Sequence, residues 1–209
     1  MWPNTPETQE LLDQARRGDA GAVDRLLTCH RESLRRVISL RLDPAVAGRV
    51  DASDIVQDVL LEASQRLADY LRNPAMPFHL WLRHIARDHV IDAHRRHRLA
   101  QRRSVDREQP AVPAVLADRS SLDLAAQFID QELTPASAAI RQELQRRLQS
   151  ALNSLDEDDR EVICMRHFEQ LSNQEVATTL QLTEAAASMR YLRALRRLRA
   201  LLVPPESEG

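Results

Sequence analysis

Apolar residues recur at every third or fourth position through several long stretches of the chain, a spacing that places them along one face of an α-helix. The clearest example follows Asp19, a residue type that caps helices. One face there carries Val23, Leu26, Leu27, His30, Leu34, Val37 and Ile38. Strands draw on aromatic residues and glycine-rich turns, but aromatic residues make up only 3% of this chain and glycine occurs four times. The sequence therefore predicts an all-α protein.

The first half of the chain predicts a series of helices with short breaks between them. Two helices extend from Pro6 to about Leu42 and are interrupted at Gly18-Asp19. After a loop, Asp51 is placed to cap the next helix, which ends before Asn73-Pro74.

Two prolines then separate this helix from the following one. Pro74 and Pro77 each remove a backbone donor and restrict the preceding residue, so residues 73–77 are expected to form a short loop. Phe78 opens a long helix that begins apolar and becomes cationic, with six arginines between Arg95 and Arg107. We expect residues 6–103 to form one domain.

Residues 104–134 predict a tether between two domains. Their apolar pattern is weak, and they contain two prolines. Six acidic residues stand against two basic ones: Asp106, Glu108, Asp118, Asp123, Asp130 and Glu132 against Arg107 and Arg119. A flexible acidic linker and an ordinary solvated one are both consistent with this composition.

Helix-start signals define a second domain over residues 135–203. Thr134-Pro135 combines a cap with proline at the first helical position, and Asp156 is placed to cap the following helix. Ser172 and Glu175 have the spacing of a capping box. The helix that they begin is short and ends near Leu180, and Thr183 is placed to cap a final helix reaching about Leu202.

These last two helices have the lengths and the short turn of a helix-turn-helix, whose second helix enters the major groove of DNA. Leu192, Leu195, Leu198 and Leu202 are expected to face the core. Five arginines lie largely outside that stripe, and no acidic residue of the helix interrupts them: Arg190, Arg193, Arg196, Arg197 and Arg199. A solvated basic face would look the same, but on this helix the arginines favour contact with DNA phosphates.

A second candidate for nucleic-acid binding is the long helix that begins at Phe78. Its aromatic residues lie at one end and its arginines at the other, an arrangement suited to a flipped base that stacks on a ring while cations hold the backbone. Trp81 fits this role and also fits a place in the core.

Other functions find little support in the sequence. Cys29 and Cys164 lie far apart within apolar helical runs, which argues against a disulfide framework. His79, His84, His89 and His94 recur every five residues and so point in different directions around a helix, which argues against a metal site. The sequence shows no catalytic motif and predicts no enzyme activity, no cofactor and no membrane-inserted segment. We expect a cytoplasmic protein.

Three segments together resemble a known family. Residues 51–58 (DASDIVQD), residues 78–96 (FHLWLRHIARDHVIDAHRR) and residues 155–199 are similar to regions two and four of the extracytoplasmic-function sigma factors. The resemblance covers most of residues 8–103 and 135–202. Three motifs in the family's order are a more specific resemblance than any one of the motifs would be alone.

The resemblance implies two helical domains with three contact surfaces. The helix after Asp51 docks on the clamp helices of the largest subunit of RNA polymerase, through Asp51, Asp54, Gln57 and Asp58. The loop and helix from Asn73 bind the minus-ten promoter element and help to melt it, through Asn73, Met76, Phe78, Trp81, Arg83, Arg87, Arg95 and Arg96.

Region four reads the minus-thirty-five element and touches the polymerase flap. Its implied contacts are Thr183, Glu184, Ala186, Ala187, Ser188, Arg190, Tyr191, Arg193, Arg196 and Arg197. In place of residues common in the family, this chain has Ser188 for a lysine and Ala185 for a glycine. An anti-sigma factor is left open as a further partner.

Two other functions compete with this interpretation: a stand-alone helix-turn-helix regulator, and a sigma-like decoy that binds a regulatory partner without DNA. The first leaves the acidic helix after Asp51 unexplained. The second is expected to have lost the arginines of its last helix, and this chain retains them.

Overall fold

A computed structural model of the chain describes residues 2–3, 5–42, 46, 50–101, 124 and 138–202, and in these residues every regular element is helical. The all-α prediction is thereby confirmed. The chain divides into two compact units, residues 1–113 and 114–209, and the division falls within the segment predicted as a tether. Apart from Leu124, residues 104–134 lie outside the described part.

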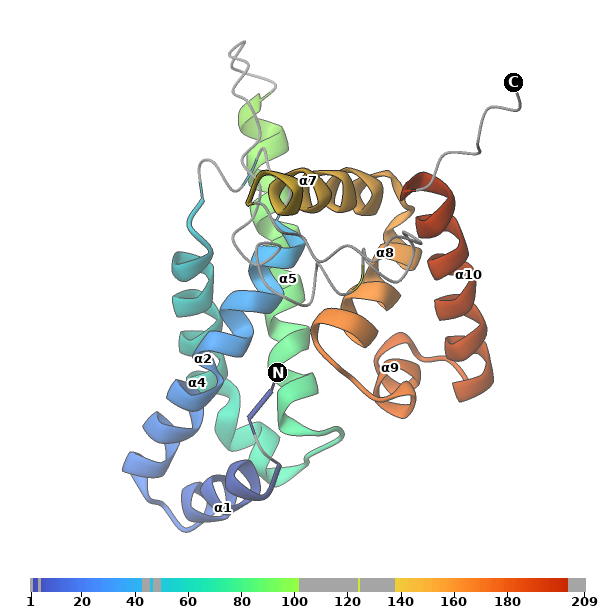
Figure 1. Cartoon of the computed structure of the whole chain (residues 1–209). Coiled ribbons are helices and arrows are strands. Elements are labelled where there is room, and N and C mark those ends of the chain that lie inside the picture. The colour runs from blue at the N-terminus through green and yellow to red at the C-terminus, as the bar shows by residue number, and fades with distance from the viewer. Residues whose placement is uncertain are drawn as a thin grey trace, which may run out of the picture. The chain divides into compact units, whose positions relative to one another are not determined.

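The first unit is a bundle of helices (Figure 1). It contains α1 (Thr5–Arg16), α2 (Ala20–Arg41), α4 (Ala52–Arg72) and α5 (Phe78–Gln101). Helices α2, α4 and α5 pack against one another, and α1 packs against α2. None of the helices in the described residues is long and apolar enough to span a membrane.

The breaks in the first unit occur where the sequence predicted them. Asp19 caps α2 by accepting a hydrogen bond from the Ala22 amide. Gly18 precedes it with φ +88, a left-handed conformation that glycine adopts at no steric cost. Asp51 caps α4 in the same way, through the Ser53 amide at 2.8 Å. These caps set the ends of the bundle, while its interior is filled by apolar residues that include Leu26, Leu34, Ile38, Val59, Ala63, Leu82 and Ala86.

The second unit contains α7 (Ala138–Ser154), α8 (Glu157–Ile163), a π-helical turn (Cys164–Phe168), α9 (Asn173–Leu180) and α10 (Glu184–Leu202). Helix α10 packs against α7, α8 and α9, as Figure 1 shows in gold, orange and red. The predicted start of the first of these helices at Thr134-Pro135 lies outside the described residues.

The predicted caps of the second unit are confirmed. Asp156 caps α8 through the Asp159 amide. Ser172 and Glu175 form a complete capping box at the start of α9. Gln181 ends α9 in the left-handed conformation, and Thr183 caps α10 through the Ala186 amide at 3.2 Å. The π-helical turn was not predicted, because it replaces one helical hydrogen-bond pattern with another without a break in the apolar pattern.

Candidate functional surfaces

An acidic face runs along the first half of α4. Asp54, Gln57 and Asp58 are exposed and lie within little more than one helical turn of one another. Leu61, one turn further on, is 60% exposed and extends the same face with an apolar side chain. Asp51 is exposed as well, but its carboxylate accepts hydrogen bonds at the start of the helix, and these lower the pKa of that carboxyl group. The face therefore offers exposed acids beside an exposed leucine.

An aromatic cluster holds the loop between α4 and α5. The rings of Tyr70 and Trp81 stack with their centroids 4.8 Å apart, and Phe78 meets Tyr70 edge-on at 5.5 Å. The Tyr70 hydroxyl donates a hydrogen bond to the backbone carbonyl of Met76 at 2.9 Å. The loop is thereby tied to the end of α4.

The structure separates the residues predicted to bind DNA around this loop. Asn73 is exposed, and Met76 and Trp81 are partly exposed, so all three are accessible to a ligand. Phe78, however, is only 3% exposed and packs in the bundle core. A direct contact between Phe78 and DNA does not fit this position, because the first apolar side chain of the helix fills the space between α2, α4 and α5.

The arginines of α5 divide in a similar way. Arg87, Arg95 and Arg96 are exposed, as a phosphate-binding role requires. Arg83 is only 1% exposed, and its side chain lies inside the protein. Arg83 and Arg87 are four residues apart and so lie on nearly the same side of α5, yet only Arg87 is exposed. Arg83 therefore does not fit the predicted DNA contact. The side chains of Arg98, Arg102 and Arg103 lie outside the described residues.

The histidines of α5 have separate surroundings. His79 lies against Trp2, with ring centroids 5.7 Å apart, and His89 contacts the Glu62 carboxylate at 2.8 Å. The Nε2–H of His94 donates a hydrogen bond to the backbone carbonyl of Arg41 at 3.1 Å. Burial lowers the pKa of His84. The contacts of His89 and His94 link α5 to α4 and α2.

Helices α9 and α10 form the predicted helix-turn-helix, with residues 181–183 as the turn. The side-chain amide of Asn173, at the start of α9, donates to the backbone carbonyl of Glu184 at 2.9 Å and so fixes the start of α10. Thr183, Glu184, Ala186 and Ser188 are exposed at this end. Ala187 is fully buried and packs in the core, so a direct contact between its side chain and a base does not fit the structure.

Three of the arginines on α10 are held by acids at the start of α8, an arrangement that we call the acid–arginine clamp. Arg197 lies 2.5 Å from both Asp156 and Asp159. Arg193 lies 3.8 Å from Asp159, and Arg190 lies 3.1 Å from Asp158. Asp159 is only 1% exposed.

The clamp modifies the prediction that all of these arginines face a nucleic acid. An exposed ion pair is worth at most about 1 kcal/mol, so Arg190, whose partner Asp158 is exposed, remains able to exchange partners. Arg193 makes the longest of these contacts, at 3.8 Å from Asp159. Arg197 is different because it binds two carboxylates, one of them buried. Tyr191 is partly buried, and the guanidinium of Arg166 lies 5.6 Å from the centre of its ring.

The remaining exposed residues of α10 form a separate outer face. Ala187, Ala194, Leu198 and Leu202 are buried, whereas Leu192, predicted to join them, is 46% exposed. Leu192 lies off the core stripe because it is two residues from Ala194, which rotates it by roughly 200° on an α-helix. It shares the outer face with Met189 and Arg196, and Arg196 has no ion pair within the described residues.

Comparison with known proteins places these surfaces in a family. Residues 26–100 match the model "Sigma-70 region 2", and residues 151–200 match "Sigma-70, region 4". The chain is 30% identical to the ECF RNA polymerase sigma factor SigD of Mycobacterium tuberculosis, across 92% of this chain and 82% of SigD. It is 27% identical to the RNA polymerase sigma-H factor of Pseudomonas aeruginosa, across 95% of both chains.

A solved structure has the same fold. It is that of CnrH in complex with the cytosolic domain of CnrY, with a TM-score of 0.59 and 26% identity, across 94% of this chain and 97% of that chain. The matches to both regions in one chain define the class of protein, a transcription initiation factor. The chain belongs to the sigma-70 family of RNA polymerase sigma factors, and within it to the extracytoplasmic-function group. It directs RNA polymerase to promoters.

Proposed function

We propose that the acidic face of α4 is the surface through which this sigma factor docks on the clamp helices of core RNA polymerase. The supporting observation is that Asp54, Gln57 and Asp58 are exposed together and have no ion pair within the described residues. Free carboxylates on a rigid helix attract a basic partner without first breaking contacts of their own. Asp51 shapes the start of this face as its cap.

The two proposed DNA-binding surfaces consist of those predicted contact residues whose side chains are at least partly exposed. The loop at residues 73–77, with Asn73 and Met76, receives a base of the minus-ten element, and Trp81 lies beside it. Arg87, Arg95 and Arg96 bind the phosphates along α5. Helix α10 reads the minus-thirty-five element with its amino-terminal end, and the same domain touches the flap. Residues 104–134 link the two domains.

Three finer points complete the proposal. The protein acts in the cytoplasm, where its polymerase is. It catalyses no reaction of its own and needs no cofactor, because its contribution is to bind and position. An anti-sigma factor regulates it, a suggestion supported by CnrH, whose solved structure is a complex with the cytosolic domain of CnrY.

Run-off transcription tests this function. Core polymerase would be incubated with a pool of genomic promoter fragments, with and without the full chain, and we expect new transcripts only when the chain is present. Asp58→Arg places a cation on the docking face and is expected to abolish both these transcripts and co-purification with core polymerase. Asp69→Arg, the same change on an exposed residue near the other end of α4, is the matched control and should retain both activities. Co-purification of Asp58→Arg at the wild-type level would refute this docking face.

A further inference from the structure

The outer face of α10 is apolar in its first half and cationic in its second. Met189 is 63% exposed and Leu192 is 46% exposed. Among the bulky apolar side chains of the described residues, Met189 has the largest exposed fraction. Arg196 and Arg199 follow one and two turns later on the same face, and both are exposed. Ala185 and Ser188 lie on this face near the helix start, and no acidic residue lies on it.

Side-chain hydrogen-bond donors are scarce near the start of this helix. Ala185, Ala186 and Met189 have none, and Thr183 and Ser188 offer one hydroxyl group each. The first arginine, Arg190, is paired with Asp158, and its side chain is 24% exposed. A bidentate contact with guanine requires arginine or lysine, so the first turns of α10 are poorly equipped to read guanine.

Apolar side chains recognise one feature of the major groove, the 5-methyl group of thymine. In a helix-turn-helix the amino-terminal part of the second helix meets the base edges. The two arginines on the same face carry charge complementary to the phosphates that border the groove. The face therefore fits duplex DNA, with apolar contact at the bases and cations at the backbone.

We propose that Met189 and Leu192 read thymine methyl groups in the major groove of the upstream promoter element, with Arg196 and Arg199 binding its phosphates. This inference rests on the proposed reading of that element by α10. It names the chemical class of base that the helix selects and assigns Met189, Leu192 and Arg199 to the contact.

The test replaces thymine with uracil, which lacks only the methyl group. The full chain, bound to core polymerase, would select duplexes from a pool with a randomised segment upstream of a fixed minus-ten sequence. We expect the selected segment to contain adjacent thymines on one strand. Replacing them with deoxyuridine should weaken binding by about fourfold for each methyl group lost from an apolar contact.

Variants then assign the effect to the outer face. Met189→Gln and Leu192→Asn keep the approximate size of each side chain and are expected to bind the thymine and uracil duplexes equally. Leu201→Ala is the matched control, because Leu201 is 47% exposed on the same helix but off the outer face. It should retain the preference for thymine.

The outcomes separate this inference from the function on which it depends. Selection of a duplex that binds equally with thymine and with uracil would overturn the methyl contact and leave promoter reading intact. If Met189→Gln retained the thymine preference but lost core polymerase, the face would be a protein contact and the inference would fail. Failure to select any upstream sequence would refute the reading of that element itself, and the methyl contact with it.

Discussion

Charged residues on α4 and on α10 were expected to serve partners, but the two helices use them differently. The acids Asp54 and Asp58 are exposed on α4 and have no ion pair within the part of the chain that the structure describes. On α10, Arg190, Arg193 and Arg197 already bind acids of the same domain. Charge on one exposed helix face therefore does not by itself identify a partner, because an acidic helix elsewhere in the domain can neutralise it.

Substitution of Phe78 is expected to have the largest effect. It was predicted to contact DNA but lies in the core, so Phe78→Ala should destabilise the first domain by about 3–5 kcal/mol. Both tryptophans belong to this domain, so tryptophan fluorescence during urea unfolding measures its stability alone. Met76→Ala, on the partly exposed loop, is the control and should leave stability unchanged. Normal stability of Phe78→Ala with lost DNA binding would restore the original prediction.

The pH dependence of stability tests the same core. His30 is 1% exposed and packs edge-on against Phe78, and burial lowers its pKa to about 4. Its unfolded pKa is about 6.5, so below that pH the unfolded state gains a proton that the folded state does not. The free energy of unfolding should fall by roughly 3 kcal/mol as the pH falls from 6.5 to 4.

His30→Phe should remove this part of the pH dependence. The comparison of wild type and variant by urea unfolding at each pH separates the histidine from the carboxyl groups that titrate in the same range. Parallel stability curves for the two proteins would show that His30 is not responsible.

Loss of the acid–arginine clamp should destabilise the second domain. Asp159→Asn removes the buried charge that holds Arg197, and we expect a cost of about 2 kcal/mol, below that of a fully buried pair because Arg197 is half exposed. Thermal unfolding followed by circular dichroism should show the loss, while tryptophan fluorescence should report an unchanged first domain. Asp158→Asn, which changes an exposed acid, should cost less than 1 kcal/mol.

The smallest expected effect is on the salt dependence of DNA binding, which should differ between substitutions of two arginines of α10. Arg196→Ala should reduce the slope of log affinity against log salt by about 0.9, the value for one phosphate contact. Arg197→Ala should lower the stability of the domain and leave the slope nearly unchanged. Equal slopes for wild type and Arg196→Ala in gel shifts would contradict the role of the outer face.

The sequence predicted the helices well because their starts depend on local contacts. Asp19, Asp51, Asp156, Ser172 and Thr183 each cap the helix that they were expected to cap. A cap bonds to an amide two or three residues away, so its spacing is visible in the sequence.

The candidate surfaces were predicted less completely, because they depend on contacts between distant segments. Arg197 and Asp159 are 38 residues apart, and their pairing follows from the packing of α8 against α10. Leu192 and Leu198 are the same residue type, and only their position on the folded helix separates an exposed side chain from a buried one.

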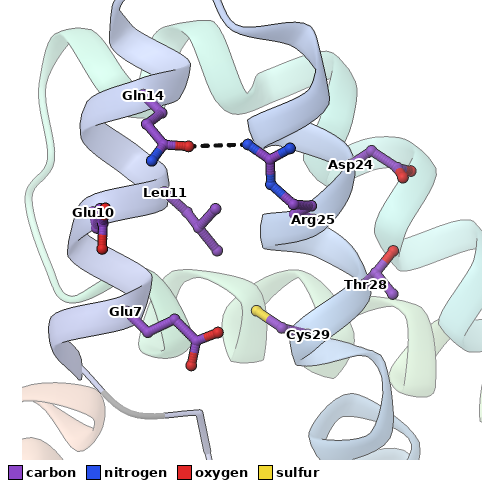
Figure 2. Close-up of a pocket in the computed structure, with 8 residues that line it drawn as sticks. All are labelled: Glu7, Glu10, Leu11, Gln14, Asp24, Arg25, Thr28 and Cys29. Atoms are coloured by element: carbon purple, nitrogen blue, oxygen red, sulfur yellow. Dashed lines mark hydrogen bonds between the residues drawn. The ribbon is translucent and has the colours of Figure 1, made fainter.

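The figures also show a feature without an assigned role. A shallow hollow between α1 and α2 is lined by Glu7, Glu10 and Cys29 among others, and the Arg25 guanidinium donates to Gln14 across it at 3.0 Å (Figure 2). Burial and the nearby Glu7 raise the pKa of the Cys29 thiol, which makes it a poor nucleophile at neutral pH.

The hydrogen bond from the Tyr70 hydroxyl to the Met76 carbonyl affects how fast the loop between α4 and α5 can bind a ligand. Because the tyrosine ring is fixed between Phe78 and Trp81, the loop that it holds has already lost much of its conformational freedom before any ligand arrives. In the proposed role, a base that enters this site meets a preformed receptor, and we expect the speed of its capture to depend on how often the DNA strand opens rather than on how fast the loop becomes ordered.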